Sequence, residues 1–307
     1  MLSMDVVFTQ ILVILLYVLV GFAAGKLGLI NPQQRKYLTR LCSDLILPFT
    51  ILSATDQDVT LQQMTSMGLA LLLLLLLFFL TTFLSVKVQT RLRVPQSVLV
   101  TTTSLVTYPN CTFLGLPLCS ALFGEIAVLY NAMAVIAFNV LFFTWQYTLF
   151  TGKPFRPRNL IAVPTLTTFA MVLMLVLGLR FPAPVQTVIS NVGAMITPLS
   201  LIIIGVMLSE NQFRSILMEK RAYLVTLVRN LIVPLAGMCI LAFMPMDAAS
   251  RLCVLVFLAC PCASLSTIYA IQYDMEPDYA ARSALLSTLF FAATLPVILL
   301  LGMRFLQ

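Results

Sequence analysis

Long apolar stretches alternate with short polar connections along the whole chain of 307 residues. A helix needs about 20 mainly apolar residues to cross the hydrocarbon core of a bilayer. By that measure the pattern predicts ten membrane-spanning helices, over residues 6–25, 41–55, 66–86, 97–122, 127–150, 160–179, 186–209, 222–243, 250–272 and 283–303. The second stretch is short and contains Asp44 and Pro48, so its limits are the least defined.

The composition agrees with this class of protein. Hydrophobic residues make up 61% of the chain, charged residues only 9%, and the mean hydropathy is +1.04. Soluble domains carry about 25% charged residues. The sequence therefore predicts an all-α integral membrane protein whose surroundings are the lipid bilayer.

Residue types that support metal and acid–base chemistry are scarce. The chain has no histidine, which removes the commonest transition-metal ligand and the commonest general base near neutral pH. Its seven cysteines lie mostly inside apolar stretches, where thiols behave as small hydrophobic groups. Cys260 and Cys262 lack the partner ligands of a metal site. We therefore predict no metal, no cofactor and no enzymatic activity.

The basic residues predict an orientation in the membrane. Fourteen of the 18 lysines and arginines lie in or beside the odd-numbered connections: Lys26, Arg35, Lys36, Arg40, Lys87, Arg91, Arg93, Lys153, Arg156, Arg158, Arg214, Lys220, Arg221 and Arg282. The other side has only Arg180, Arg251 and Arg304. Because cytoplasmic loops are rich in Lys and Arg, both termini should lie outside the plasma (inner) membrane. The net charge of +7 follows from this topology, so we predict no nucleic-acid partner.

Two pairs of prolines divide the chain into related halves. Pro109 and Pro261 are 152 positions apart, and Pro48 and Pro198 are 150 apart. The first pair falls on the fourth helix of each half, the second pair on the second helix. With five helices a half, the second copy enters the membrane from the opposite side, so we predict inverted repeats over residues 1–152 and 153–307.

A proline inside a helix removes one hydrogen bond and clashes with the preceding turn, so all four prolines are predicted to interrupt their helices. An ordinary kink is the alternative at each of them. Matching positions in the two halves favour broken helices four and nine that cross at a binding site. Neutral polar groups surround both breaks and, with exposed helix-end amides, could hold an anion. The candidate binding residues are Tyr108, Pro109, Asn110, Cys111, Pro261, Cys262 and Ser264.

Two ionisable residues lie inside predicted spans, where such groups are costly and usually functional or paired. Asp44 is a candidate coupling or counter-charge group, and the alternative is a residue that caps the helix or reaches the interface. Arg229 is a candidate for attracting an anion, and the alternative is structural pairing. Outside the spans, Asp274, Glu276 and Asp278 form an acidic turn that we expect to be a solvated helix start.

Several segments resemble the auxin efflux carrier family, which includes bacterial carriers and the plant PIN proteins. Residues 109–118 read PNCTFLGLPL and are followed by ALFG at 121–124, which resembles the asparagine and Gly-x-Pro signature of that family. The segments DLILP at 44–48 and RNLIVP at 229–234 resemble its second and eighth helices. The similarity runs the whole length of the chain.

This resemblance implies a fold, a mechanism and a substrate class. The fold is that of the bile-acid, auxin and antiporter-type carriers, with scaffold helices 1, 2, 6 and 7 and transport helices 3–5 and 8–10. One domain would move against the other to give alternating access to a small organic anion, such as malonate, malate or an auxin-like acid. Asn110, Pro109 and Pro261 carry over as the substrate site, and the scaffold implies a homodimer. The short connection between helices 5 and 6 indicates a bacterial-type member.

Other functions stay open at this point. A sodium-coupled symporter of the bile-acid type differs in needing several converging oxygens, and the coupling ion could be a proton or sodium. A membrane receptor or sensor on a transporter fold would normally carry an output domain. An intramembrane enzyme would need paired aspartates or histidines.

Overall fold

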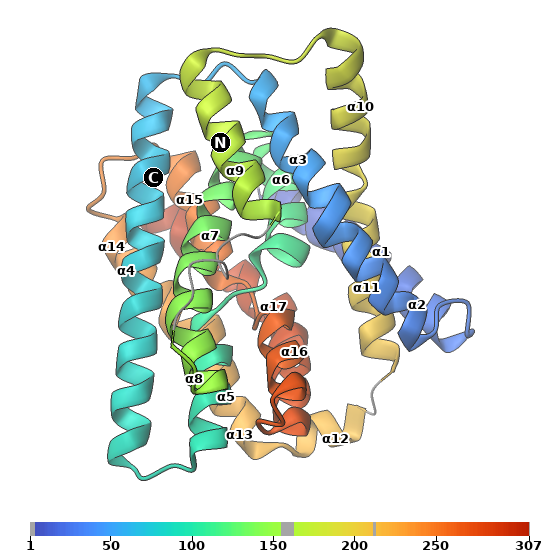
Figure 1. Cartoon of the computed structure of the whole chain (residues 1–307), viewed down its shortest axis with the longest axis vertical. Helices are drawn as coiled ribbons and strands as arrows, with labels where there is room; N and C mark the ends of the chain where they lie inside the picture. The colour runs from blue at the N-terminus through green and yellow to red at the C-terminus, as the bar shows by residue number, and fades with distance from the viewer. Residues whose placement is uncertain (1–3, 155–162, 211–212, 307) are drawn as a thin grey trace. The chain divides into compact units, whose positions relative to one another are not determined.

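A computed structural model describes residues 4–154, 163–210 and 213–306, and within these ranges the regular structure is entirely helical (Figure 1). The basic residues Arg156 and Arg158, which contribute to the predicted orientation, lie outside the described residues. The chain divides into two compact units, each built from several separate segments.

The first unit contains residues 1–67, 112–135 and 161–212. It holds α1 (Met4–Lys26), α2 (Pro32–Leu41), α3 (Leu47–Ser53), α6 (Leu116–Phe123), α9 (Val163–Leu177), α10 (Ala183–Ala194), α11 (Ile196–Ser209) and the first part of α7 (Ile126–Leu141). The segments of the predicted scaffold helices fall in this unit, together with residues 112–135. Their mechanical role stays a prediction.

The second unit contains residues 68–111, 136–160 and 213–307. It holds most of α4 (Leu61–Arg91), the end of α7, and α5 (Gln96–Thr107), α8 (Tyr147–Thr151), α12 (Phe213–Met218), α13 (Lys220–Leu227), α14 (Val233–Leu241), α15 (Ala248–Ala259), α16 (Ser264–Gln272) and α17 (Pro277–Phe305). Both proline-containing breaks of the predicted site belong to this unit.

The predicted apolar stretches coincide with helices or pairs of helices. Six described helical segments are long and apolar enough to cross a membrane: Pro32–Asp56, Leu61–Arg91, Ile126–Thr151, Ala183–Ser209, Lys220–Leu241 and Pro277–Phe305. Four shorter apolar helices correspond to the remaining stretches: Leu12–Lys26, Cys111–Phe123, Val163–Leu177 and Ala248–Ala259. The chain is therefore a multi-pass membrane protein, while the count of ten spans stays a prediction.

The second predicted helix begins earlier than hydropathy indicated. It starts at Pro32, because Asn31 and Gln34 form a reciprocal capping box and Pro32 has the backbone angle of a first helical residue. This first turn is polar and carries Arg35, so the apolar pattern does not report it. The helical segment is therefore longer than predicted, since Pro32–Asp56 contains the predicted stretch 41–55 together with this polar start.

Helical structure continues through Pro48. The π-helical segment Cys42–Ile46 leads directly into α3, and its wider turn accommodates the proline, which lacks an N–H. The π-helical segments Cys111–Gly115 and Val228–Ile232 likewise end two residues before a proline. Pro198 lies in the first turn of α11, which begins at Ile196, and the single residue Met195 separates α11 from the end of α10. The interruption predicted at Pro48 is therefore wrong, whereas the one predicted at Pro198 takes the form of a one-residue break at Met195, three residues before the proline.

Within the first unit, α1 and α11 pack side by side through glycines (Figure 1). A Cβ atom added at Gly205 would lie 2.0 Å from the Val18 carbonyl oxygen, and one at Gly21 would lie 2.1 Å from the Ile202 carbonyl oxygen. Such contacts are far inside van der Waals distance, so only glycine fits at either position. Small residues that let two backbones approach are typical of helix pairs in membranes.

Candidate functional site

The two predicted breaks are confirmed as gaps in the helices of the second unit. Helix α5 ends at Thr107, and the chain runs through Tyr108, Pro109 and Asn110 before helical structure resumes at Cys111. Helix α15 ends at Ala259, and α16 begins at Ser264. Each gap therefore exposes backbone groups that a continuous helix would have satisfied.

The gaps satisfy each other by forming a short antiparallel bridge between Pro109 and Cys262. The Asn110 N–H donates to the Pro261 carbonyl at 2.7 Å, and the Ala263 N–H donates to the Tyr108 carbonyl at 2.9 Å. Because the register pairs Pro109 with Cys262, the bridge uses the N–H groups of Asn110 and Ala263 as donors and requires none from either proline. The structure thus brings Tyr108, Pro109, Asn110, Pro261 and Cys262 together.

Arg229, on the π-helical segment Val228–Ile232, contacts both gaps with its side chain. Its guanidinium is fully buried and donates to carbonyls at the ends of both broken helices. Nε donates to Cys260 at 3.1 Å, Nη1 donates to Thr107 at 2.9 Å and Val106 at 3.2 Å, and Nη2 donates to Leu258. The structural-pairing interpretation of Arg229 thus has a definite form, in which the partners are backbone oxygens.

The next residue, Asn230, holds the second gap through α17. Its Nδ2 donates to the Ser287 carbonyl at 2.8 Å, while the Ser287 hydroxyl donates to Asn230 Oδ1 at 2.7 Å. The same hydroxyl accepts the Cys262 N–H at 3.2 Å. A buried hydrogen-bonded chain therefore runs from the π-helical segment through α17 to the gap.

The ring of Tyr108 packs within an aromatic cluster of the second unit. The ring is fully buried, and its centroid lies 5.8 Å from that of Phe78, 5.1 Å from Phe138 and 5.0 Å from Phe142. Edge-to-face and tilted contacts at these distances are favourable and fix the orientation of the ring. Tyr108 therefore anchors the first gap in the core of the unit.

Asn110 is a polar side chain at the gaps whose carboxamide makes no hydrogen bond within the described residues. Its residue is 8% exposed, and no hydrogen bond joins its carboxamide to another described residue. Ser264 is the half-buried first residue of α16, and Cys111 is buried. Deeper in the unit, the Ser104 hydroxyl of α5 donates to the Ser266 hydroxyl of α16 at 2.8 Å. The amide of Asn110 is thus available for a ligand.

Asp44 belongs to the first unit and lies on the π-helical segment Cys42–Ile46. Its side chain is 55% exposed, and the Arg40 Nε donates to it at 3.1 Å from one helical turn earlier. The Ser43 hydroxyl also donates to its other oxygen. Its candidate role in coupling stays a prediction.

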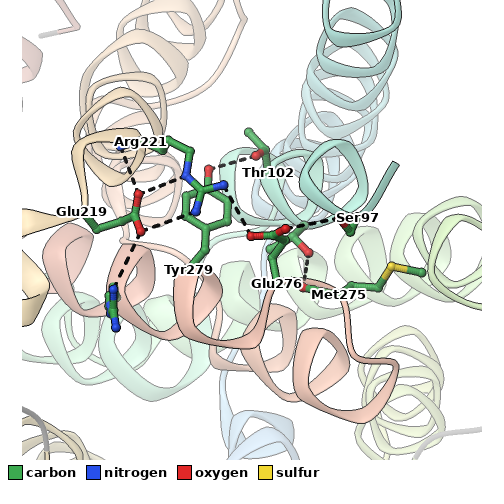
Figure 2. Close-up of polar contacts among 9 residues, drawn as sticks. Ser97, Thr102, Glu219, Arg221, Met275, Glu276 and Tyr279 are labelled. Atoms are coloured by element: carbon green, nitrogen blue, oxygen red, sulfur yellow. Dashed lines mark hydrogen bonds and ion pairs between the residues drawn. The ribbon is translucent and has the colours of Figure 1, made fainter. Parts of the chain in front are cut away.

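A second polar cluster joins α5, α13 and α17 (Figure 2). Arg221 donates to Glu219 at 3.0 Å and to Glu276 at 3.4 Å, and its guanidinium lies 4.3 Å over the Tyr279 ring. The Ser97 hydroxyl of α5 donates to Glu276 at 3.3 Å. The predicted helix start is confirmed, with Asp278 in the first turn of α17 and both Asp274 and Asp278 exposed, whereas Glu276 departs from the prediction because Ser97 and Arg221 bond to it. The hydrogen bond from Arg221 holds the pKa of the Glu219 carboxyl below its usual value.

The residues that sequence reasoning missed are Asn230 and Ser287. A signal for both was present, since each is a polar residue inside a predicted span, where amides and hydroxyls often join helices. Nothing in the sequence identifies the N–H or carbonyl that each one meets.

Comparison with known proteins adds one result to this geometry. A family model described as "Membrane transport protein" matches the chain twice, over residues 6–159 and 158–299, so the two matches together extend over nearly the whole sequence. A search of curated proteins found no match. The family is one of membrane transporters, and the resemblance to auxin efflux carriers is confirmed. The chain therefore belongs to the membrane transport protein family, to which the auxin efflux carriers belong.

Proposed function

We propose that this chain is a secondary carrier of small organic anions, such as malonate, malate or an auxin-like acid, and that it holds them at the paired helix gaps. The observation that carries the proposal is the free carboxamide of Asn110, at the place where two helices of the second unit stop and restart against each other. Membership of a transporter family supplies the class of activity.

The chemistry of the gaps suits a carboxylate. The side chains of the two gap segments themselves, Tyr108–Asn110 and Cys260–Ala263, are neutral, and Asn110 can donate through its amide. The first turn of α16 starts at Ser264 and presents N–H groups that have no partner within the helix, at its positive end. Such a helix start binds anions without a charged side chain. A carboxylate of modest size would be held by these donors.

Movement of the substrate would come from alternating access. We expect helices 1, 2, 6 and 7 to act as scaffold and helices 3–5 and 8–10 to carry the site. The division of the chain into two compact units, with both gaps in the second, supports this arrangement. Residues 112–135 cluster with the first unit, so they are where the predicted division departs from the structural one.

Its location and assembly are further parts of the proposal. The concentration of basic residues in alternate connections supports a plasma (inner) membrane protein with both termini outside. A homodimer through the scaffold helices follows from the family resemblance. Analytical ultracentrifugation in detergent and protease access to either terminus in oriented vesicles would test these two points.

The substrate site is tested by ligand-induced stabilisation. Purified protein is heated with malonate, malate or indole-3-acetate, and with malonamide as an uncharged control. A ligand that binds only the folded state raises the melting temperature by mass action. We expect at least one carboxylate to raise it and malonamide to leave it unchanged. No rise with any carboxylate would count against the substrate class.

Asn110→Ala then tests the residue. Loss of one charge-assisted hydrogen bond costs about 1.5–3 kcal/mol, which corresponds to a roughly 10- to 150-fold rise in Kd. Stability without ligand should change little, because the carboxamide has no internal partner. Asn191→Ala, at an exposed asparagine of α10, is the matched control and should bind like the wild type. Unchanged affinity in Asn110→Ala would remove this residue from the site.

A further inference from the structure

Arg229 carries a buried charge whose partners are all backbone oxygens. Among the described residues no carboxylate lies within ion-pair distance of its guanidinium. Four carbonyls surround it instead, at Val106 and Thr107 on one broken helix and at Leu258 and Cys260 on the other. An arginine side chain stays protonated in proteins, so the charge persists at this position.

The charge of the guanidinium matches that of the two helix ends. Thr107 and Ala259 are the last residues of α5 and α15, so both helices point their negative ends at Arg229. Each carboxyl end is equivalent to about −0.5 elementary charge, and together they amount to about −1. One guanidinium neutralises that charge without an acidic side chain.

The same arrangement of oxygens is what a small cation needs. In carriers with broken helices, unwound carbonyls and the carboxyl ends of half-helices coordinate the sodium ion or proton that drives transport. Hard cations bind several oxygen ligands that converge on one point. Here the converging oxygens already face a guanidinium that the chain supplies itself.

We propose that Arg229 is a built-in counter-ion, which holds the position that a coupling cation would occupy at the carboxyl ends of the two broken helices. It acts as a positioning residue, because its guanidinium donates to carbonyls at both gaps and so fixes their geometry. One of these carbonyls belongs to Thr107, three residues before Asn110. The consequence for transport, which rests on the proposed carrier function, is that anion binding needs no sodium. The sodium-coupled symporter is thereby disfavoured at this position.

The test measures how stability depends on cations, with no substrate present. The full-length protein is melted in sodium, lithium, potassium or N-methyl-D-glucamine chloride at equal ionic strength. Wild type and Arg229→Lys, which keeps the charge, should show one melting temperature in all four salts. Arg229→Gly should melt lower in N-methyl-D-glucamine and recover by several degrees in sodium or lithium, because a free cation can then enter between the carbonyls.

Low concentrations of guanidinium ion serve as a second probe of Arg229→Gly. Recovery with guanidinium but with no metal cation would show that Arg229 is only a set of hydrogen-bond donors, and would overturn the proposal. A sodium-specific rise in the melting temperature of the wild type would overturn it too. If Arg229→Gly does not fold, Arg229→Gln replaces it, since a shorter uncharged amide also frees carbonyls. A folded variant with the same melting temperature in all four salts refutes the idea.

Failure of the proposed carrier function would appear in the carboxylate experiment and not in the cation experiment. If no carboxylate stabilises the protein while Arg229→Gly recovers in sodium, the substrate proposal fails and the counter-ion proposal stands. If carboxylates stabilise the wild type only in sodium, the substrate proposal stands and the counter-ion proposal fails.

Discussion

Ser287→Ala is the substitution that should reveal how far the second gap depends on its neighbours. The Ser287 hydroxyl is fully buried on α17, donates to Asn230 at 2.7 Å and accepts the Cys262 N–H at 3.2 Å. Alanine removes both interactions and adds no bulk. It leaves a carboxamide oxygen and a backbone N–H buried without that partner.

The cost can be worked from these two bonds. Hydrogen bonds between membrane helices average about 0.6 kcal/mol each and reach about 1.7 kcal/mol. Two of them give a loss of about 1–3 kcal/mol. The upper half of that range applies, because a buried group left unpaired keeps its full desolvation penalty. We expect the free energy of unfolding to fall by about 2–3 kcal/mol.

Ser283→Ala is a closely matched control. Ser283 lies one turn earlier on the same helix and is also fully buried, but its hydroxyl has no hydrogen-bond partner among the described residues. Removing a buried hydroxyl that makes no bond should be neutral or slightly stabilising. The two variants therefore differ in the hydrogen bonds lost and share the change of residue type.

A thiol-reactive dye can follow unfolding of both variants in detergent. Six of the seven cysteines are buried and only Cys239 is exposed, so the signal rises when the fold opens. Denaturant titration of the wild type and the two variants then gives the free energies. Equal losses of unfolding free energy for Ser287→Ala and Ser283→Ala would refute the reasoning, because they would show that the hydrogen bonds of Ser287 with Asn230 and Cys262 add no stability.

Two other regions offer independent tests. Because Arg221 depresses the pKa of Glu219, the ion pair contributes stability above the usual carboxyl pKa of about 4.5, and this contribution is lost as the pH falls through the lower pKa of the folded state. The melting temperature of the wild type should fall toward that of Glu219→Gln on acidification, and a constant difference between them would contradict this. Gly205→Ala should destabilise by about 1–3 kcal/mol, because its Cβ would lie 2.0 Å from the Val18 carbonyl oxygen. Gly68→Ala, with no described atom within 4 Å of its added Cβ, should melt at or above the wild-type temperature, and equal melting of the two alanine variants would refute the packing argument.

The parts of the fold that were predicted correctly depend on local properties of the chain. Apolar runs located the helices because solvation by lipid acts on each residue in turn. The gaps at Pro109 and Pro261 were predicted because a proline lacks its N–H wherever it lies. The early start of α2 was missed for the complementary reason: a capping box is polar, and hydropathy treats it as a connection.

Prolines show where local reasoning ends. The rule that a proline interrupts a helix applies equally to Pro48, Pro109 and Pro261, yet only the last two lie in non-helical backbone. At Pro48 a π-helical turn supplies the extra room, and the helix continues. The outcome depends on whether another segment offers hydrogen bonds to the freed groups, as the two gaps offer each other, and that is a property of the tertiary structure.

The partners of Arg229 depend even more strongly on the tertiary structure. A charged residue in a membrane span suggests an opposite charge or an ionic ligand, and a search of the sequence for that partner leads to acidic residues such as Asp44. The oxygens that receive its guanidinium belong to Val106, Thr107, Leu258 and Cys260, whose side chains carry no charge. Backbone carbonyls are present at every position, so no residue type marks the few that converge on a cation. The negative partner of Arg229 arises only when two helices end at the same place, and it therefore becomes visible only in the folded chain.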